Sequence, residues 1–307
     1  MSEPRRPSPE NTDALRAKRH GLETRALVLR GIRELFHQLG FLEVETPVRL
    51  RTPAMEAHID AEPAGARWLR TSPELHCKRL LAAGYDKVYT LGPCFRQNEL
   101  GGRHHPEFTM LEWYRARAGY RDILDDTLLL LRRLAPAGIP RPGHRIDTHR
   151  HHEITVSEAF LQFADWDPCH AFDEERFERD LMEKVEPSLP RDAPVVLIDY
   201  PRECAALARC KEEPPHTGER WELYLDGVEI ANAYGELTDP AEQRRRFEEW
   251  AALRAAEGRE VYPLDEPFLA ALASGLPPCA GIALGVDRLA MILAGATTLD
   301  EVIAFRE

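Results

Sequence analysis

Long apolar runs are missing from this sequence. The most apolar stretch, residues 282–293, is interrupted by Asp287 and Arg288 and is too short to cross a membrane. The first residues, MSEPRRPSPEN, lack the apolar core of a secretory signal peptide. We therefore expect a cytoplasmic protein with no membrane partner.

Cysteine pairs are also missing. The six cysteines are scattered along the chain, and no two of them form a CxxC pair. This pattern argues against a disulfide framework and is typical of reduced thiols in the cytoplasm.

Basic residues are outnumbered by acidic ones. The chain has 40 Lys and Arg against 52 Asp and Glu, so its formal net charge is −12. This balance argues against broad nucleic-acid binding through phosphate neutralisation. A hydrophobic content of 43% is nevertheless enough for a real core. We expect residues 1–12, which are rich in proline and charge, to be flexible.

The stretch FRQNELGGRHHPEFTMLEWY, residues 95–114, predicts two strands joined by an exposed loop. Alternation in the second strand places Phe108, Met110, Glu112 and Tyr114 on one face. A carboxylate is costly to bury without a partner, so Glu112 on such a face indicates a cationic ligand.

Two arginines bracket the loop of this stretch. Arg96 precedes it and Arg103 lies near its end. Guanidinium groups match phosphate oxygens in geometry and charge, so the pair indicates a polyphosphate ligand.

The stretch WELYLDGVEIAN, residues 221–232, predicts a β-hairpin with Asp226 and Gly227 in the turn. Strict alternation then places Glu222, Tyr224, Glu229 and Ala231 on one face. Two carboxylates on one face favour a divalent cation between them, although an exposed acidic face is the simpler alternative. Asn232 reaches the same ligand only if a bulge interrupts the alternation.

Two further stretches predict strand or turn followed by a helix. In TSPELHCKRLLAAG, Ser72 is a suitable N-cap, Pro73 suits the first helical position, and Glu74 favours the helix dipole. In GIALGVDRLAMILAG, a strand ends at Gly285 and a helix begins near Val286. Glycines at positions 281 and 285 allow a flat ligand to approach the backbone.

The N-terminal part predicts a long amphipathic helix over residues 13–39, which ends at Gly40 and is followed by a short strand. The outer face of this helix is basic and indicates either a solvated surface or a docking site for an acidic partner. Its basic residues are Arg16, Lys18, Arg19, Arg25, Arg30 and Arg33.

Together these stretches resemble the three motifs of class II aminoacyl-tRNA synthetases. Residues 95–114 resemble motif 2 in the RHxPEFTMLEWY form of the lysyl branch, GVDR resembles the GxDR of motif 3, and the N-terminal helix and strand resemble motif 1. The resemblance implies an α+β catalytic domain over residues 13–307, with a mainly antiparallel sheet flanked by helices. It also implies a homodimer formed through motif 1.

The family reaction activates a carboxylate with ATP and Mg²⁺ to form an acyl-adenylate. The resemblance implies that Arg96 holds the α-phosphate, that Arg288 contacts the γ-phosphate or adenine, and that Glu222 and Glu229 carry magnesium. The ATP-binding residues that it implies are Arg96, Gln97, Asn98, Glu99, His104, His105, Phe108, Glu229, Ile230, Gly285 and Arg288.

The same resemblance implies an acidic pocket for a diamino acid, in which Glu74 faces the α-amino group and other polar side chains face the second ammonium. The implied substrate-binding residues are Ser72, Pro73, Glu74, Glu112, Tyr114, Asn232, Glu236 and Ala283.

Two positions depart from the lysyl pattern. The Arg-x-Glu of motif 2 is replaced by Arg96-Gln97-Asn98, with Glu99 one place later, and either Asn98 or Glu99 can accept from the adenine amino group. Ala283 stands where lysyl synthetases carry glycine, and its methyl group reshapes the floor of the amino-acid pocket.

A further departure concerns the anticodon-reading OB-fold, for which the sequence before motif 1 leaves no room. With the acidic net charge, this predicts that tRNA is not the acceptor. The chain resembles free-standing lysyl-synthetase paralogues that attach (R)-β-lysine to a lysine of elongation factor P. Two alternatives stay open: activation of α-lysine for tRNA or a small amine, and an inactive paralogue that binds ATP or lysine to regulate a partner.

Overall fold

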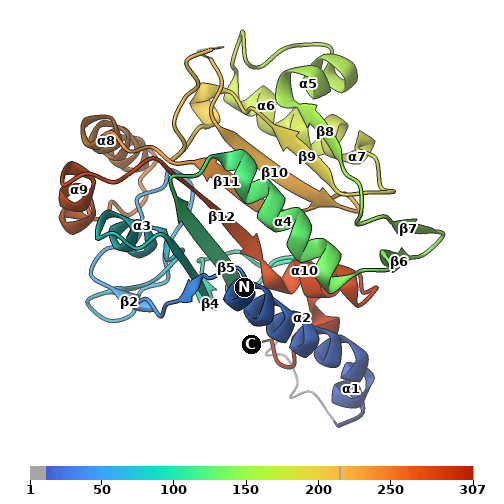
Figure 1. Ribbon diagram of the computed structural model, residues 1–307. Helices are drawn as coiled ribbons and strands as arrows, with labels where there is room; N and C mark the ends of the chain where they lie inside the picture. Colours follow the sequence, from blue (N-terminus) through green and yellow to red (C-terminus); the bar gives the residue numbers. More distant parts are fainter. Residues whose placement is uncertain (1–11, 214–215, 307) are drawn as a thin grey trace, which may run out of the picture.

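A computed structural model describes residues 12–213 and 216–306, and its centre is an eight-stranded sheet (Figure 1). The strand order is β1-β4-β5-β12-β11-β10-β9-β8. The two outermost pairs, β1 with β4 and β8 with β9, are parallel, and every pair between them is antiparallel. This mainly antiparallel sheet with flanking helices confirms the α+β class.

The strands of the main sheet are β1 (Leu42–Glu43), β4 (Lys87–Phe95), β5 (Glu107–Ala116), β8 (His152–Thr155), β9 (Val195–Ile198), β10 (Arg220–Leu225), β11 (Val228–Gly235) and β12 (Cys279–Gly285). Two small hairpin-like sheets pair β2 (Arg49–Leu50) with β3 (Trp68–Leu69) and β6 (Ile139–Arg141) with β7 (His144–Ile146).

The α-helices are α1 (Thr12–Ala17), α2 (Arg19–Gln38), α3 (Glu74–Ala82), α4 (Tyr120–Leu134), α5 (Val156–Ala164), α6 (Glu174–Asp180), α7 (Glu186–Ser188), α8 (Pro240–Ala256), α9 (Glu266–Ala273) and α10 (Val286–Leu293). Short helical turns of other types are η1 (Leu181–Val185), η2 (Arg202–Cys204) and η3 (Leu299–Glu301). Among the residues described, no helix has both the length and the apolar character needed to span a membrane.

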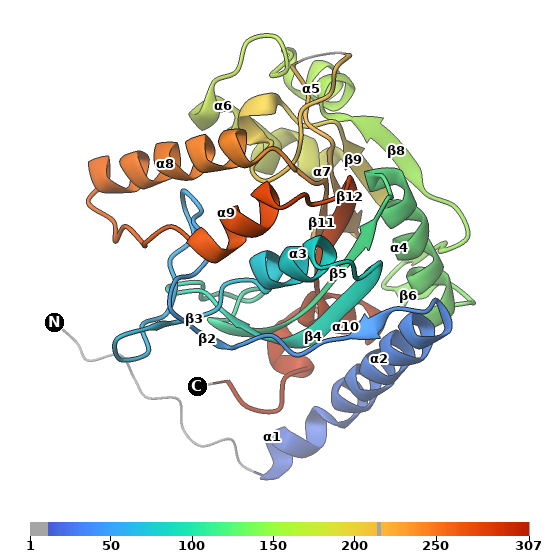
Figure 2. The same cartoon turned by 60° about the vertical axis from the view of Figure 1, so that its left-hand side comes forward.

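The two faces of the sheet are buried by different helices (Figures 1 and 2). Alternation along β5 explains this division, because successive side chains point to opposite faces. Leu111 and Trp113 pack in the main core with side chains of α2, α4 and α10. Tyr114 packs on the other side with side chains of α3, α8 and α9.

The N-terminal helix differs from the prediction in its beginning and in its basic face. Of the segment 1–12 predicted to be flexible, residues 1–11 lie outside the described residues, and Thr12 already begins α1. The long helix is split into α1 and α2, and Gly40 follows it with a φ of 76°, as expected for a glycine stop.

The basic face is mostly a solvated surface. Exposed ion pairs at helical spacing join Arg16 to Asp13, Arg19 to Glu23 and Arg30 to Glu34, and such pairs contribute little to stability. Two of the residues assigned to this outer face instead point inward. Lys18 donates to the carbonyl oxygens of residues 303 and 304, and Arg25 donates to Asp287.

Candidate active site

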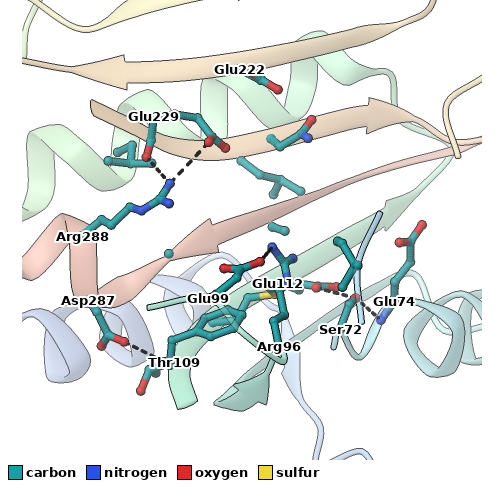
Figure 3. A pocket seen from close by; sticks show the side chains of 18 of the residues that line it. Ser72, Glu74, Arg96, Glu99, Thr109, Glu112, Glu222, Glu229, Asp287 and Arg288 are labelled. Atoms are coloured by element: carbon teal, nitrogen blue, oxygen red, sulfur yellow. Dashed lines mark hydrogen bonds and ion pairs between the residues drawn. The ribbon is translucent and has the colours of Figure 1, made fainter. Parts of the chain in front are cut away.

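One cavity, with a volume of about 460 Å³, lies on the sheet between the β4–β5 loop, α3 and the start of α10 (Figure 3). It brings together most of the predicted site residues. Those that line it are Ser72, Glu74, Arg96, Glu99, His104, His105, Phe108, Glu112, Tyr114, Glu222, Glu229, Ile230, Asn232, Glu236, Ala283, Gly285 and Arg288.

Three predicted residues do not line this cavity. Pro73 occupies the N-cap position of α3, so the helix begins one residue later than expected. The Ser72 hydroxyl nevertheless accepts from the Glu74 backbone N–H at 2.9 Å. The backbone N–H of Gln97 donates to the carbonyl of Asp60, and Asn98 adopts a φ of 66°. Of the two candidate acceptors for adenine, Glu99 is therefore the one whose side chain faces the cavity.

A buried carboxylate marks one end of the cavity. Glu112 accepts a hydrogen bond from the Ser72 hydroxyl at 2.7 Å and another from the Tyr114 hydroxyl at 2.6 Å. Burial, and then the nearby Glu74 carboxylate, raise the pKa of Glu112 to about 7 against the lowering effect of these hydrogen bonds. A cationic ligand at this end would stabilise the ionised form.

A lysine that the sequence analysis did not single out lies among the pocket carboxylates. The Lys78 ammonium is 2.5 Å from Glu74 and 2.6 Å from Glu236, and its side chain is fully buried. The available signal was its i, i+4 spacing from Glu74 in the predicted helix. That spacing alone could not show that the pair is buried.

The floor of this end is set by strand register. Ala283 on β12 pairs with Glu112 on β5 and with Asn232 on β11, so its methyl group lies between these two side chains on the same face.

The hairpin turn is confirmed, but one of its faces was assigned wrongly. Leu225 pairs with Val228 and Tyr224 with Glu229, as predicted. The register then shifts between residues 223 and 224, so that Glu222 pairs with Asn232. The bulge therefore brings Asn232 to the cavity and turns Ala231 into the main core instead.

The other end of the cavity is built around Arg96. Its guanidinium lies 5.3 Å from the centre of the Phe108 ring and 3.6 Å from Glu99, and its Nε is buried without a hydrogen-bond partner. Burial lowers the pKa of Arg96, but Glu56 and Glu99 outweigh burial and raise it. A cation with an unpartnered buried donor is suited to an anionic ligand.

Glu56 was missed because no sequence pattern marks it. It lines the cavity, and burial raises its pKa to about 7 against the lowering effect of Arg96.

Arg288 joins three segments at this end. Its guanidinium donates to the Glu229 carbonyl at 2.9 Å and to the Glu229 carboxylate at 3.3 Å (Figure 3). It also donates to Nε2 of His104 at 2.6 Å, so this nitrogen is unprotonated. Burial and then the charge of Arg288 lower the pKa of His104, which is consistent with that state.

Glu222 and Glu229 form an acidic pair on the hairpin. Glu222 accepts from Tyr200 at 2.5 Å, from Tyr224 at 2.8 Å and from Arg220 at 2.6 Å. Burial and then the charge of Glu222 raise the pKa of Glu229 to about 7, so a cation between them would relieve their repulsion.

The described residues contain no cluster of three or more potential metal ligands. Two carboxylates nevertheless suit a magnesium ion that arrives on nucleotide phosphates, because Mg²⁺ takes most of its ligands from phosphate and water. The Glu222–Glu229 pair therefore fits an ATP-borne ion better than a resident one.

The two glycines of β12 have different roles, and one differs from the expectation. A Cβ at Gly281 would lie 2.2 Å from ring carbons of Tyr114 and 2.7 Å from Glu236, so this glycine makes room for the Tyr114 ring. A Cβ at Gly285 would have its nearest neighbour at 3.8 Å, and Gly285 lines the cavity. Only Gly285 is placed to let a ligand approach the backbone.

Asp287 connects the three motifs. Its carboxylate accepts from Arg25 on α2 and, at 2.9 Å, from the backbone N–H of Thr109 on β5. Arg25 also donates to the Thr109 hydroxyl at 2.7 Å. This cluster fixes the start of α10, and with it the position of Arg288.

Comparisons with known proteins agree with this geometry. A family model described as tRNA synthetases class II (D, K and N) matches residues 14–307. Elongation factor P–(R)-β-lysine ligase of Hamiltonella defensa subsp. Acyrthosiphon pisum (strain 5AT) is 38% identical, with 92% of this chain and 93% of that protein covered. Proteins of the same name from Photorhabdus laumondii and Proteus mirabilis are 37% and 36% identical over the same shares. The chain therefore belongs to the class II tRNA synthetase family (D, K and N).

Proposed function

We propose that this protein is an ATP-dependent ligase that converts (R)-β-lysine to an aminoacyl-adenylate and transfers it to a lysine side chain of elongation factor P. The relatives that match over more than nine-tenths of their length carry this name. The observation that carries the proposal is one cavity with arginines at one end and buried carboxylates at the other.

In the first step, a carboxylate oxygen of the amino acid attacks the α-phosphorus of ATP, and the bond to the β-phosphate breaks to release pyrophosphate. Such a reaction depends on positioning and charge neutralisation. Arg96 would contact the α-phosphate through its unpartnered Nε. Arg288 would neutralise the leaving phosphates, and magnesium held by Glu222 and Glu229 would draw off negative charge when bound.

In the second step, the neutral amine of the acceptor lysine attacks the acyl carbon of the adenylate, and AMP leaves. The nitrogen loses a proton as the amide forms. The amino acid is held for this step by its two ammonium groups, for which Glu74 and the Glu112–Glu236 end of the cavity are the proposed partners.

We further propose that β-lysine is preferred to α-lysine because of Ala283. Its methyl group lies between Glu112 and Asn232, where it would exclude one placement of the substrate backbone and favour the isomer whose amino group is one carbon further from the carboxylate. Activation of α-lysine for another acceptor, and a purely regulatory role, are not favoured by the names of the relatives. A regulatory chain would also have no need of the Glu222–Glu229 pair.

We propose a homodimer formed through α2, with elongation factor P rather than tRNA as the acceptor. The exposed apolar side chain of Leu27 on α2 is consistent with such an interface.

Amino-acid-dependent pyrophosphate exchange into ATP tests the first step. We expect exchange with (R)-β-lysine to exceed exchange with α-lysine in kcat/KM. No exchange with either amino acid would refute both enzyme readings, and faster exchange with α-lysine would refute the proposed preference.

A further inference from the structure

A buried cation lies behind the acidic end of the cavity. Lys78 lies on α3, and its ammonium bridges Glu74 on the same helix and Glu236, which directly follows β11. We propose that Lys78 is a positioning residue that orients the Glu74 and Glu236 carboxylates for the ammonium groups of a diamino acid and favours the ionised form of Glu236. This inference rests on the proposed function and assigns a specificity role within the same site.

The contacts of Lys78 are short and buried. The ammonium contacts Oε1 of Glu74 at 2.5 Å and Oε2 of Glu236 at 2.6 Å. Both carboxylate residues also line the cavity. The side-chain exposure is 0% for Lys78 and 1% for Glu236, so neither charge is compensated by bulk water.

The charge balance explains why a fixed cation is useful here. The Glu74 carboxylate raises the pKa values of Glu112 and Glu236, and Glu112 also raises that of Glu236. Burial raises the pKa of Glu236 to about 8, even though Lys78 lowers it. Without Lys78, the pKa of Glu236 would be higher still, and a protonated carboxyl group cannot form an ion pair with the substrate.

The titratable and charged groups that face the pair are Glu56, Arg70, Glu74, Cys77, Glu112, Tyr114, Arg209, Tyr234, Glu236 and Cys279. Burial raises the pKa values of Cys77 and Tyr114 well above their usual range, and it raises that of Cys279 to about 12. Between pH 6 and 8.5 the carboxyl groups of Glu56, Glu112 and Glu236 are thus the groups of this set with a raised pKa inside the range. Of these three groups, only Glu236 has an ion pair with Lys78, so the comparison of variant with wild type isolates its ionisation.

Two other roles make opposite predictions. If Lys78 only attaches α3 to the end of β11, its removal lowers the melting temperature and leaves the substrate's KM and its pH profile unchanged. If Lys78 instead takes the place of a substrate ammonium, its removal frees both carboxylates and tightens substrate binding.

The test compares Lys78→Met and Lys78→Arg with wild type. Calorimetric titration with (R)-β-lysine alone and pyrophosphate exchange are measured from pH 6 to 8.5, and folding is checked by circular dichroism. We expect Lys78→Met to weaken β-lysine binding about tenfold at pH 7, which corresponds to a carboxyl pKa raised by about one unit. The loss should shrink towards pH 8.5, the KM for ATP should not change, and Lys78→Arg should recover part of the affinity.

A matched control removes a cation whose ion-pair partner does not line the cavity. Arg115, the residue after Tyr114 on β5, forms an ion pair with Asp126 at 3.1 Å. Arg115→Met should lower the melting temperature but leave the affinity for β-lysine and its pH profile unchanged. If Lys78→Met does not fold, Lys78→Gln, which keeps a hydrogen-bond donor but removes the charge, takes its place with the same expected results.

In Lys78→Met, a pH profile of β-lysine affinity that matches wild type, or tighter β-lysine binding, would overturn the positioning role. Wild-type protein that binds β-lysine but catalyses no exchange would refute the proposed function, while the titrations would still decide the role of Lys78. Wild-type protein that neither binds nor exchanges β-lysine would refute both proposals.

Discussion

The guanidinium of Arg288 on α10 donates to Nε2 of His104, in the loop between β4 and β5, at 2.6 Å. The C-terminal segment holds the same loop. Arg306 donates to the carbonyl oxygens of Gly101 and His104, both at 2.9 Å, and the backbone N–H of Leu299 donates to Gly102 at 3.0 Å. The loop that borders the Arg96 end of the cavity, where we propose that the nucleotide binds, is therefore fixed by residues close to the end of the chain.

Removing Arg306 should loosen this loop. We expect Arg306→Ala to raise the KM for ATP by up to about 30-fold, because the two lost hydrogen bonds are each worth on the order of 1 kcal/mol. The KM for the amino acid should stay the same, because its pocket lies at the other end of the cavity. Steady-state exchange kinetics with each substrate varied in turn would measure both values. A parallel rise in the two KM values would contradict this division.

The two glycines of β12 provide a matched pair of substitutions. Gly281→Ala would place a methyl group 2.2 Å from the Tyr114 ring, and the ring or the strand would have to move. We expect this variant to lose about 1–3 kcal/mol of unfolding free energy, as overpacked cores do, and to bind the amino acid weakly. In Gly285→Ala the nearest atom is 3.8 Å away, so its unfolding free energy should remain close to that of wild type. Urea denaturation of both variants would test this difference, and equal losses would refute the explanation.

Ala283→Gly should change which lysine isomer is activated. Removal of the methyl group between Glu112 and Asn232 enlarges the pocket floor, so we expect the ratio of kcat/KM values to move towards α-lysine. A change of 1–3 kcal/mol in the discrimination, about 10- to 200-fold, is the range for one methylene-sized group. The KM for ATP provides the internal control and should not change. An unchanged ratio would show that the methyl group does not decide the preference.

The pH dependence of stability and of substrate affinity should have opposite signs. Burial raises the pKa of Glu112 to about 7 and that of Glu236 to about 8 from a usual value of 4.5. Above pH 4.5 the folded, ligand-free protein therefore binds more protons at these sites than the unfolded chain does. The stability that these groups contribute is present below pH 4.5 and is lost as the pH rises through 7 to 8.

Substrate binding needs the ionised carboxylates, so affinity for a diamino acid should increase over the same interval. We expect the rise in melting temperature caused by saturating β-lysine to be larger at pH 8.5 than at pH 6. Thermal unfolding with and without the amino acid would measure this difference. A ligand-induced rise that is the same at both pH values would show that these carboxylates do not titrate with binding.

Local sequence patterns were sufficient for the strands that carry the site. Period-two alternation placed Phe108, Met110, Glu112 and Tyr114 on one face, and all four line the cavity. The Asp226-Gly227 pair located the hairpin turn. Both features depend on neighbouring residues alone, and their patterns are therefore visible without tertiary structure.

Tertiary contacts account for what the sequence did not reveal. The bulge in the hairpin breaks strict alternation, so Ala231 was assigned to the wrong face. Lys78 was not singled out, because its helical spacing from Glu74 does not reveal its buried ion pair with Glu236, which is distant in sequence. Likewise, Arg25 was assigned to a solvated face because its partner Asp287 lies on another helix.

Transfer of labelled (R)-β-lysine tests the central claim most directly. Purified protein, ATP and magnesium are incubated with elongation factor P or with tRNA, and the label in each acceptor is measured after separation. The account predicts stable, amide-linked label on a lysine of elongation factor P and none on tRNA. Label on tRNA in preference to the protein, or adenylate formation with transfer to neither, would contradict it.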